Sequence, residues 1–382
     1  MPDLTFAPNP DLLTGADRKA GWNQPENRRY GFHNLHEIGR YGQSFRASHV
    51  LELAMRADIS IAAREDVGRL TGLPWFSGMV VARGGEILYE KYAPDFGPDQ
   101  PHSIMSISKT TMNLVIGQLW AEGKLSLDEK IGDCLPWIGA GYAGATIQEV
   151  LNMDVLNDYS EDYADPMARV WDHEVASGFR LPEGDEREIG TLEFLATIGL
   201  APGAADCRNQ TGEAMYRSAN TDILAAIAEV RGGRRISSYL ADIADAAGLE
   251  GSLHTICDRD GFVAVSGGHC LTARDLARYG LLIARRGQGA AGLSVGSADF
   301  IEATLKGGVP MPAPRGRIRY SNQTNTNGRW LGHGGYGGQY MLIDMQSGTV
   351  GVFFSVLENA AGYDADYYVP IIAMLEAIAT GN

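Results

Sequence analysis

The chain has 382 residues and a formal net charge of −15, and 45% of its residues are hydrophobic. This length and apolar content suffice for one large core or for two lobes. The acidic balance argues against nucleic acid or an anionic membrane surface as a partner. No window of the sequence is apolar enough to span a membrane.

The N-terminal segment MPDLTFAPNPDLL has no basic stretch followed by an apolar run, so we expect no signal peptide and a cytoplasmic protein. The four cysteines form no C-x-x-C pair, and we expect them to be reduced thiols. His33 and His36 form an H-x-x-H pattern without a supporting cluster of ligands. We therefore expect no metal site and no cofactor.

Hydrophobic spacing and turn residues predict the elements in chain order. An irregular extension over 1–45 is expected to precede helical structure within 46–66. A β-hairpin follows, with strands at 77–83 and 87–89 joined by Gly84-Gly85. The later elements are helices at 106–122, 146–153, 191–199, 219–231, 235–247 and 272–286, strands at 340–344 and 349–356, and a helix at 367–380.

Strands near both ends with helices between them indicate an α+β fold, in which the two ends build one antiparallel sheet flanked by helices. Strict alternation of strand and helix is absent, which weighs against a doubly wound parallel sheet. We expect an α/β lobe from 46–105 and 291–382, a mainly α-helical lobe from 106–290, and an active site between the lobes.

The segment 154–190 is long, acidic and without periodicity, and such segments often cover a site. The carboxylates of this segment could bind the cationic amino end of a substrate, or they could simply form a solvated acidic face of the protein. They include Glu161, Asp162, Asp165 and Glu174.

Ser106 and Lys109 form an S-x-x-K pattern at the start of a predicted apolar helix. Side chains three residues apart lie on one helical face, so the Lys109 amine can reach the Ser106 hydroxyl. Burial lowers the pKa of a lysine and makes it a base that can activate a serine nucleophile. The simpler interpretation is that Ser106 caps the helix and Lys109 is solvated.

Two later stretches could complete such a site. Tyr216 precedes the helix at 219–231 and could transfer a proton to a leaving group, with a pKa lowered by the nearby lysine. Ser218 to Asp222 could simply cap that helix. The glycine-rich run from His333 to Gly338 enters a strand, and the N–H of Tyr336 could join that of Ser106 in an oxyanion hole.

These three stretches, in this order, resemble the serine β-lactamase and penicillin-binding-protein superfamily, in its class C and esterase branch. Ser106 and Lys109 match the S-x-x-K motif, Tyr216 the tyrosine motif, and His333-Gly334-Gly335 the K/H-x-G motif. Within the superfamily the sequence is most similar to the nylon-oligomer hydrolases, over about residues 75–360. The resemblance implies a β-lactamase/transpeptidase-like fold with an all-α lobe and a small ester or amide substrate, and it is compatible with a homodimer.

The resemblance also implies a substrate pocket, which departs from the family pattern. It places Tyr163, Glu174, Ser266, His333 and Gly335 against the substrate. Glu174 would take the position of an acidic residue that binds an amino end, and Ser266 would replace an asparagine. The usual Tyr-x-Asn motif is absent, because the asparagine lies four residues after Tyr216, at Asn220.

Two alternatives remain open. Ala264-Val265-Ser266-Gly267-Gly268 is close to a G-x-S-x-G nucleophile elbow, with His333 downstream. The chain could also be a penicillin-binding-like sensor or binding module that Ser106 acylates without turnover. Retention of Ser106, Lys109 and Tyr216 together favours a serine hydrolase that cleaves carboxylic amides or esters through an acyl-enzyme.

Overall fold

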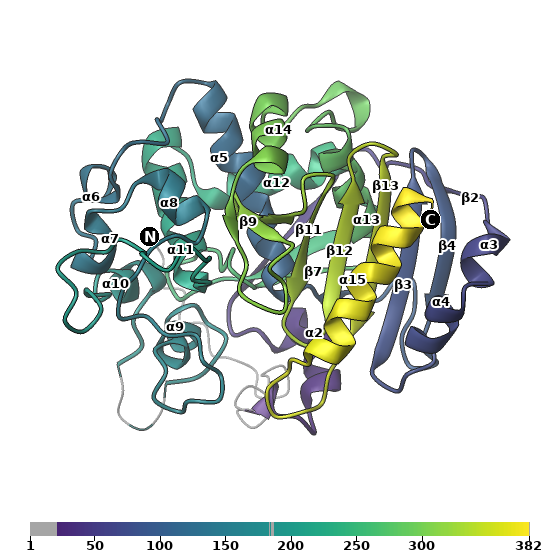
Figure 1. Ribbon diagram of the computed structural model, residues 1–382, viewed down its shortest axis with the longest axis horizontal. Helices are drawn as coiled ribbons and strands as arrows, with labels where there is room; N and C mark the ends of the chain where they lie inside the picture. Colours follow the sequence, from purple (N-terminus) through teal and green to yellow (C-terminus); the bar gives the residue numbers. More distant parts are fainter. Residues whose placement is uncertain (1–20, 183, 185–186, 382) are drawn as a thin grey trace, which may run out of the picture.

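The computed structural model describes residues 21–381 except 183, 185 and 186. Its main feature is a nine-stranded sheet built from both ends of the described chain (Figure 1). In spatial order its strands are β2 (Ala54–Met55), β4 (Glu86–Tyr92), β3 (Phe76–Arg83), β13 (Thr349–Ser355), β12 (Gln339–Asp344), β11 (Trp330–Gly335), β10 (Thr324–Thr326), β9 (Arg319–Ser321) and β8 (Val309–Pro310). Neighbouring strands pair antiparallel, apart from the short β2, which runs parallel to β4.

Both faces of this sheet are covered by helices. Helix α15 (Ala365–Thr380) lies across the near face in Figure 1, and α13 (Ala273–Ala284) packs on the far face. Successive side chains of a strand point to opposite faces, so β3 supplies residues to two cores. Met79 and Val81 pack in the α15 core, whereas Val80 and Ala82 belong to the larger core behind the sheet.

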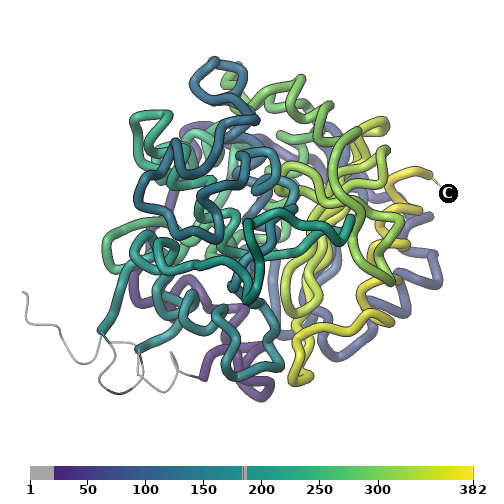
Figure 2. The backbone as a smooth tube through the Cα atoms, turned by 60° about the vertical axis from the view of Figure 1, so that its left-hand side comes forward, coloured from purple at the N-terminus to yellow at the C-terminus, as the bar shows by residue number. Residues whose placement is uncertain are grey.

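Most of the remaining helices lie to one side of the sheet, and Figure 2 shows the two halves in contact from another direction. They are α5 (Thr111–Ala121), α6 (Ile131–Cys134), α7 (Ala140–Ala143), α8 (Ile147–Leu151), α9 (Val170–Ala176), α10 (Thr191–Leu195), α11 (Ser218–Gly232), α12 (Ile236–Ala247) and α14 (Ala298–Lys306). There are also two 3₁₀ helices, η2 (Met105–Thr110) and η3 (Ala290–Gly292), and the short helices α3 (Ile59–Ala62) and α4 (Glu65–Leu70).

A second, four-stranded sheet was not expected from the sequence. It consists of β1 (Gly42–Arg46), β6 (Ser252–Ile256), β7 (His269–Leu271) and β5 (His102–Ser103), in that order. Helix α2 (Arg28–Ile38) packs beside it. Strand β5 ends immediately before η2, so this sheet fixes the backbone that leads into the S-x-x-K segment.

The α+β fold with an antiparallel sheet from both ends is confirmed, and so are the two predicted hairpins. The irregular extension over 1–45 is wrong for its described part, which contains α2 and most of β1; residues 1–20 lie outside the described residues. The helical structure predicted within 46–66 is found only in α3 and at the start of α4, because an extended segment with β2 precedes them. Val50 and Ile59 are exposed, so they do not belong to a buried helical face.

The predicted division into two lobes stays a prediction, although α13 of the segment 106–290 packs on the large sheet as well as against α12. In the part of the chain that the structure describes, no helix combines the length and the apolar character needed to cross a membrane.

Candidate active site

Ser106 and Lys109 lie on the 3₁₀ helix η2, not on the start of an α-helix as the sequence predicted. A 3₁₀ helix has three residues per turn, so the side chains at positions i and i+3 eclipse each other. The Lys109 Nζ is 3.0 Å from the Ser106 Oγ. Met105, directly before Ser106, has a φ of 45°, which is rare for a residue with a side chain and marks local strain.

Lys109 is completely buried, and its amine has three acceptors around it. Besides the Ser106 Oγ, these are the Ser218 Oγ at 2.9 Å and the main-chain carbonyl of Ser266 at 2.5 Å. Burial lowers the pKa of Lys109 to about 8, and the charges of Glu161 and Asp222 partly oppose this effect. Lys109 is still mainly protonated near physiological pH, but its neutral form is far more accessible than that of an exposed lysine.

Ser218 connects Lys109 to Glu161, a carboxylate of the segment that the sequence predicts to cover the site. Its hydroxyl donates to Glu161 Oε1 at 2.8 Å, and its main-chain N–H donates to Glu161 Oε2 at 2.5 Å. Ser218 opens helix α11, but its side chain bonds Glu161 and Lys109 rather than the helix. The capping interpretation of this residue is therefore wrong.

The phenol of Tyr216 is buried and lies near Ser106. The Lys109 Nζ is 5.0 Å from the centre of the Tyr216 ring, and the nearby Ser106 hydroxyl lowers the phenol's pKa slightly. Burial is the larger effect and raises the pKa of Tyr216 well above its usual value. The expected lowering of this pKa by Lys109 is therefore wrong, because desolvation penalises the phenolate more than nearby groups favour it. Tyr216 is a neutral hydrogen-bond donor.

The end of strand β11 approaches η2 closely. A Cβ atom added to Gly335 would lie 2.6 Å from the Ile104 carbonyl oxygen and 3.2 Å from the Met105 Cβ. Only glycine therefore allows this strand to lie against the turn that carries Ser106. Tyr336 follows Gly335 directly, which places its main chain beside the same turn.

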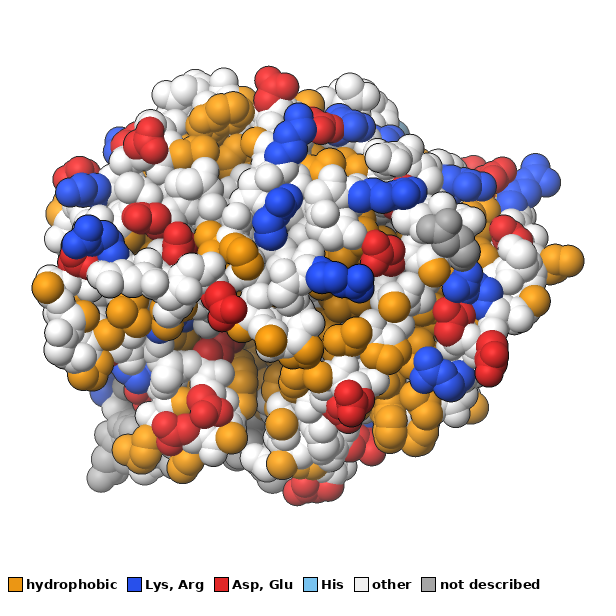
Figure 3. Space-filling view, viewed as in Figure 1, with side chains coloured by type: hydrophobic (Ala, Val, Ile, Leu, Met, Phe, Trp, Pro, Cys, Tyr) orange, Lys and Arg blue, Asp and Glu red, His pale blue; other side chains and the backbone are white. Residues whose placement is uncertain are grey.

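A cavity of about 270 Å³ joins these groups. Its wall contains Ser106, Glu161, Tyr163, Tyr216, His333, Gly335 and Tyr336, together with Met311, Arg315, Asn325, Gly334, Ala361, Gly362, Tyr363 and Tyr368. We call it the catalytic cavity. The face of the molecule seen in Figure 3 is hollowed below its centre, between the helical side and the sheet side.

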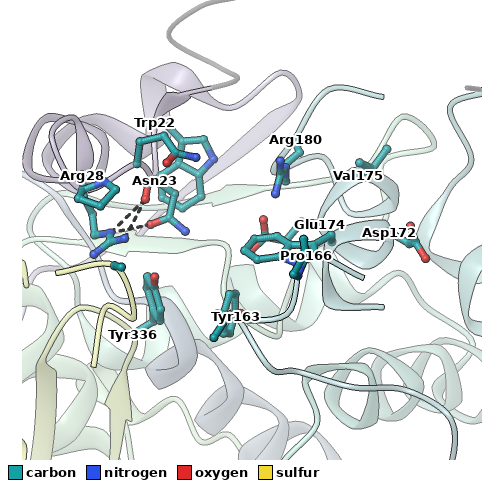
Figure 4. Close-up of a pocket in the computed structure, with 15 residues that line it drawn as sticks. Trp22, Asn23, Arg28, Tyr163, Pro166, Asp172, Glu174, Val175, Arg180 and Tyr336 are labelled. Carbon is teal, nitrogen blue, oxygen red and sulfur yellow. Dashed lines mark hydrogen bonds between the residues drawn. The ribbon is translucent and has the colours of Figure 1, made fainter. Parts of the chain in front are cut away.

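A larger cavity of about 650 Å³ adjoins the catalytic cavity, and Tyr163 and Tyr336 line both. Their ring centres are 5.0 Å apart, and Figure 4 shows the two rings side by side at one edge of this outer cavity. Glu174 lines the outer cavity only. The structure therefore separates Glu174 from Ser106 by the Tyr163–Tyr336 pair.

Other residues that the sequence associated with the site make contacts within the protein and do not face either cavity. Ser266 is buried, does not line either cavity, and contacts Lys109 through its carbonyl. It lies in a turn, and the next helix begins only at Ala273, so the nucleophile-elbow alternative lacks the required turn into a helix. Asn220 is fully buried, accepts a hydrogen bond from Tyr142 and donates to the Val150 carbonyl.

The histidines are also held by structural hydrogen bonds. His333 Nε2 lies 3.1 Å from the Tyr320 hydroxyl and its Nδ1 lies 2.7 Å from the Gly334 carbonyl. Burial lowers the pKa of His333 to about 3, so this ring is neutral. His33 bonds Ser77, and the described residues contain no group of three or more His, Cys, Asp or Glu side chains arranged to hold a metal ion.

A buried contact between a histidine and an aspartate lies near Lys109. His173 Nε2 is 2.9 Å from Asp222 Oδ2, and both side chains are almost completely buried. The other ring nitrogen of His173 lies 3.0 Å from the Tyr159 hydroxyl. Asp222 is on α11, four residues after Ser218, and His173 is on α9, next to Glu174. This contact links α11, which begins at Ser218, to α9, which carries Glu174 of the outer cavity.

The comparisons with known proteins agree with this geometry. Residues 75–370 match the beta-lactamase family model. The chain is 32% identical over 307 residues to the 6-aminohexanoate-dimer hydrolase of Paenarthrobacter ureafaciens, with 78% of this chain and 75% of the relative covered.

Solved structures share the fold at lower identity. A protein described as “Putative 6-aminohexanoate-dimer hydrolase” from Bacillus anthracis is 19% identical, with a TM-score of 0.79 and 98% of each chain covered. The penicillin-binding protein from Bacillus halodurans is 16% identical, with a TM-score of 0.57, 81% of this chain covered and 99% of the other. The chain belongs to the beta-lactamase family and is a serine hydrolase with the beta-lactamase fold.

Proposed function

We propose that this chain hydrolyses carboxylic amides and esters through an acyl-enzyme on Ser106, with Lys109 as the base and Tyr216 as the proton relay. The observation that carries the proposal is the arrangement of acceptors around the buried Lys109 amine. A neutral amine has two N–H donors and one lone pair. The Ser266 carbonyl can only accept, and the Ser218 hydroxyl gives its own proton to Glu161. These two acceptors take the two amine protons, which leaves the lone pair directed at the Ser106 hydroxyl, 3.0 Å away.

Acylation then follows in balanced steps. Lys109 takes the Ser106 proton while Oγ attacks the substrate carbonyl, and the N–H groups of Ser106 and Tyr336 stabilise the oxyanion. Tyr216, a neutral phenol, gives its proton to the departing amine or alcohol and regains one from Lys109. Water attacks the acyl-enzyme with the same groups acting in reverse, and the acid leaves.

The substrate that we propose is a linear amide. The relative from Paenarthrobacter ureafaciens is named for hydrolysis of an amide dimer. The two adjoining cavities give room for a chain that extends from Ser106 past Tyr163 and Tyr336. Tyr163 and Glu174 would contact that chain, and Glu174 supports a preference for a cationic amino end in the outer cavity.

Hydrolysis of a short-chain nitrophenyl ester and of a linear amide by the wild type and Ser106→Ala tests the assignment. Ser106→Ala is expected to abolish both activities and to keep the wild-type melting temperature. Wild-type turnover in this variant would exclude Ser106 as the nucleophile. Stoichiometric labelling of the wild type without turnover would instead favour a sensor or binding module.

Comparing an amino-terminated amide with its neutral N-acetyl counterpart tests the role of Glu174. The ratio of the two kcat/KM values is expected to fall in Glu174→Gln. No preference in the wild type would remove the proposed amino-end site.

A further inference from the structure

The turn between β9 and β10 consists of Asn322 and Gln323, and both side chains are almost completely buried. Their φ values are 45° and 64°. A two-residue hairpin turn with positive φ at both positions favours glycine at the second one. Here a glutamine takes that position against the steric preference of L-residues. Strained backbone of this kind persists only where the surrounding contacts hold it, and it is frequent at functional sites.

The contacts of Gln323 join two helices. Its Nε2 donates to the carbonyls of Val150 and Leu151, at 3.3 and 3.1 Å, at the end of α8. Its main-chain N–H donates to the same Leu151 carbonyl at 2.9 Å. Its Oε1 accepts from the Thr221 hydroxyl, 2.7 Å away, in the first turn of α11. One residue of the large sheet therefore connects the end of one helix to the start of another.

The end of α8 supports the segment that carries Tyr216. Met153 lies two residues beyond this helix. Its carbonyl accepts from the Met215 N–H at 2.7 Å, and its Sδ accepts from the Arg217 N–H at 3.4 Å. These two bonds hold the main chain on both sides of Tyr216. A shift at the end of α8 would therefore move the phenol.

The second attachment, at Thr221, reaches the support of Lys109. Thr221 lies three residues after Ser218 on α11, so the two side chains are neighbours on one helical face. The Ser218 hydroxyl accepts from Lys109. On the sheet side, β10 pairs with β11, the strand that leads into Tyr336 and its proposed oxyanion donor. The turn thus ties the sheet side of the site to the helical side.

The first residue of the turn, Asn322, is anchored on α5 and α14 as well. The Thr304 hydroxyl on α14 accepts from the side chains of Asn322 and Asn113, at 3.0 and 2.9 Å. It donates to the Phe300 carbonyl in its own helix. Thr304 is fully buried, like Gln323. Its bonds hold the turn from the side away from the contacts that support Tyr216.

We propose that Gln323 is a positioning residue for the reaction, because through α8 and α11 it holds the Tyr216 phenol where the phenol can protonate the leaving group. This inference rests on the proposed function, since it requires Tyr216 to be the proton relay. Gln323 is buried and lines neither the catalytic cavity nor the outer cavity, so it acts through Tyr216 and not on the substrate. A leaving group that needs a proton should therefore be sensitive to Gln323, and one that departs as a stable anion should not.

An ethyl ester and a nitrophenyl ester of the same linear acid provide the test. Ethoxide must be protonated as it departs, whereas nitrophenolate leaves without a proton. The ratio of the two kcat/KM values therefore reports the proton transfer, and it does not change when only the folded fraction falls. Gln323→Met removes the amide and keeps the length of the side chain. It is expected to lower the ratio about tenfold or more, which is part of the roughly 100- to 10,000-fold that a positioned general acid contributes.

Thr221→Val removes only the bond to α11 and should lower the ratio in the same direction. Thr304→Val is the matched control, because it removes bonds on the α14 side of the same turn. Its melting temperature should fall while its ratio stays at the wild-type value. Tyr216→Phe is the reference and should lower the ratio at least as much as Gln323→Met.

The inference is overturned if Tyr216→Phe lowers the ratio but Gln323→Met and Thr221→Val keep it at the wild-type value. It is also overturned if Thr304→Val lowers the ratio as much as Gln323→Met, because the effect would then follow from loosening the turn in general. An unchanged ratio in Tyr216→Phe would overturn the proposed proton relay, and with it the role of Gln323.

Discussion

The hydroxyl of Ser218 donates a hydrogen bond of 2.8 Å to the carboxylate of Glu161. This bond fixes the direction of the hydroxyl proton, so the same oxygen can only accept from Lys109, whose Nζ is 2.9 Å away. A base in a buried site needs its lone pair held toward the nucleophile. Ser218 accepts one of the two N–H groups of the neutral Lys109 amine, and this limits the directions in which the lone pair can point. In the proposed mechanism, Ser218 therefore positions Lys109.

Ser218→Ala is expected to lower kcat/KM by roughly 10- to 100-fold. The variant removes a hydrogen bond to a charged group, for which a contribution of roughly 1.5–3 kcal/mol is typical. The amine could then rotate its lone pair away from Ser106. Steady-state hydrolysis of a nitrophenyl ester measures the change. Ser44→Ala is the control, because Ser44 is exposed on β1 and bonds only His254. An unchanged rate in Ser218→Ala would exclude the positioning role.

The rate should depend on pH through Lys109, because only the neutral amine accepts the Ser106 proton. kcat/KM is expected to rise with pH and to reach half its maximum near pH 8, the value to which burial lowers the pKa of Lys109. The negative charge of Glu161 holds this pKa up, so Glu161→Gln should move the midpoint to lower pH. A pH profile of kcat/KM measures both.

Asp162→Asn is the matched control for that shift. Asp162 is exposed, and its carboxylate accepts from the Ala164 N–H, which an asparagine oxygen can also do. The midpoint of Asp162→Asn should equal that of the wild type. A midpoint in Glu161→Gln that stays in place or rises would contradict the proposed coupling between Glu161 and Lys109.

The architecture was predictable where local patterns and burial agree. The strands at 340–344 and 349–356 alternate residues into two cores, and the turn between them contains Gly348 at a φ of 69°. The helix predicted at 235–247 is found as α12. The small sheet was missed because its four strands are short, and because the β1–β6 and β5–β7 pairings join segments about 170 to 210 residues apart, whereas only β6 and β7 are close in sequence. Such pairing leaves no local signal.

The candidate site was likewise predictable where sequence motifs report it and not where it depends on contacts between distant segments. Ser106, Lys109 and Tyr216 follow from motifs, and the structure brings them together. Ser218 had a signal that was overlooked, since Tyr216-Arg217-Ser218 occupies the spacing of the Tyr-x-Asn motif. Glu161 was named in the segment expected to cover the site, but its bond to Ser218 was not predictable, because that bond depends on the segment folding against α11. The raised pKa of Tyr216 also depends on burial, which no motif reports.

Asp222→Asn is expected to destabilise the protein by roughly 1–3 kcal/mol, the usual cost of leaving a buried polar group without its partner. Asp222 and His173 are both almost completely buried, so water cannot replace the lost partner. Urea-induced unfolding measures the change. Asp242→Asn is the control, because its pair with Arg234 is largely exposed and should contribute less than about 1 kcal/mol. If both variants lose the same free energy of unfolding, burial does not make the Asp222 contact more important than the exposed Asp242 pair.

Gly335→Ala is expected to impair catalysis more than stability. The added Cβ would lie 2.6 Å from the Ile104 carbonyl oxygen, so β11 or η2 must shift by a few tenths of an ångström or more. A shift of about 1 Å in a catalytic group can lower the rate 100-fold, whereas overpacking typically destabilises by about 1–3 kcal/mol. Ester hydrolysis and urea unfolding are measured on the same preparation. Gly68→Ala is the control, because a Cβ at this position in α4 meets no atom within 4 Å. If Gly335→Ala keeps wild-type kcat, close contact between β11 and the Ser106 turn is not needed for catalysis.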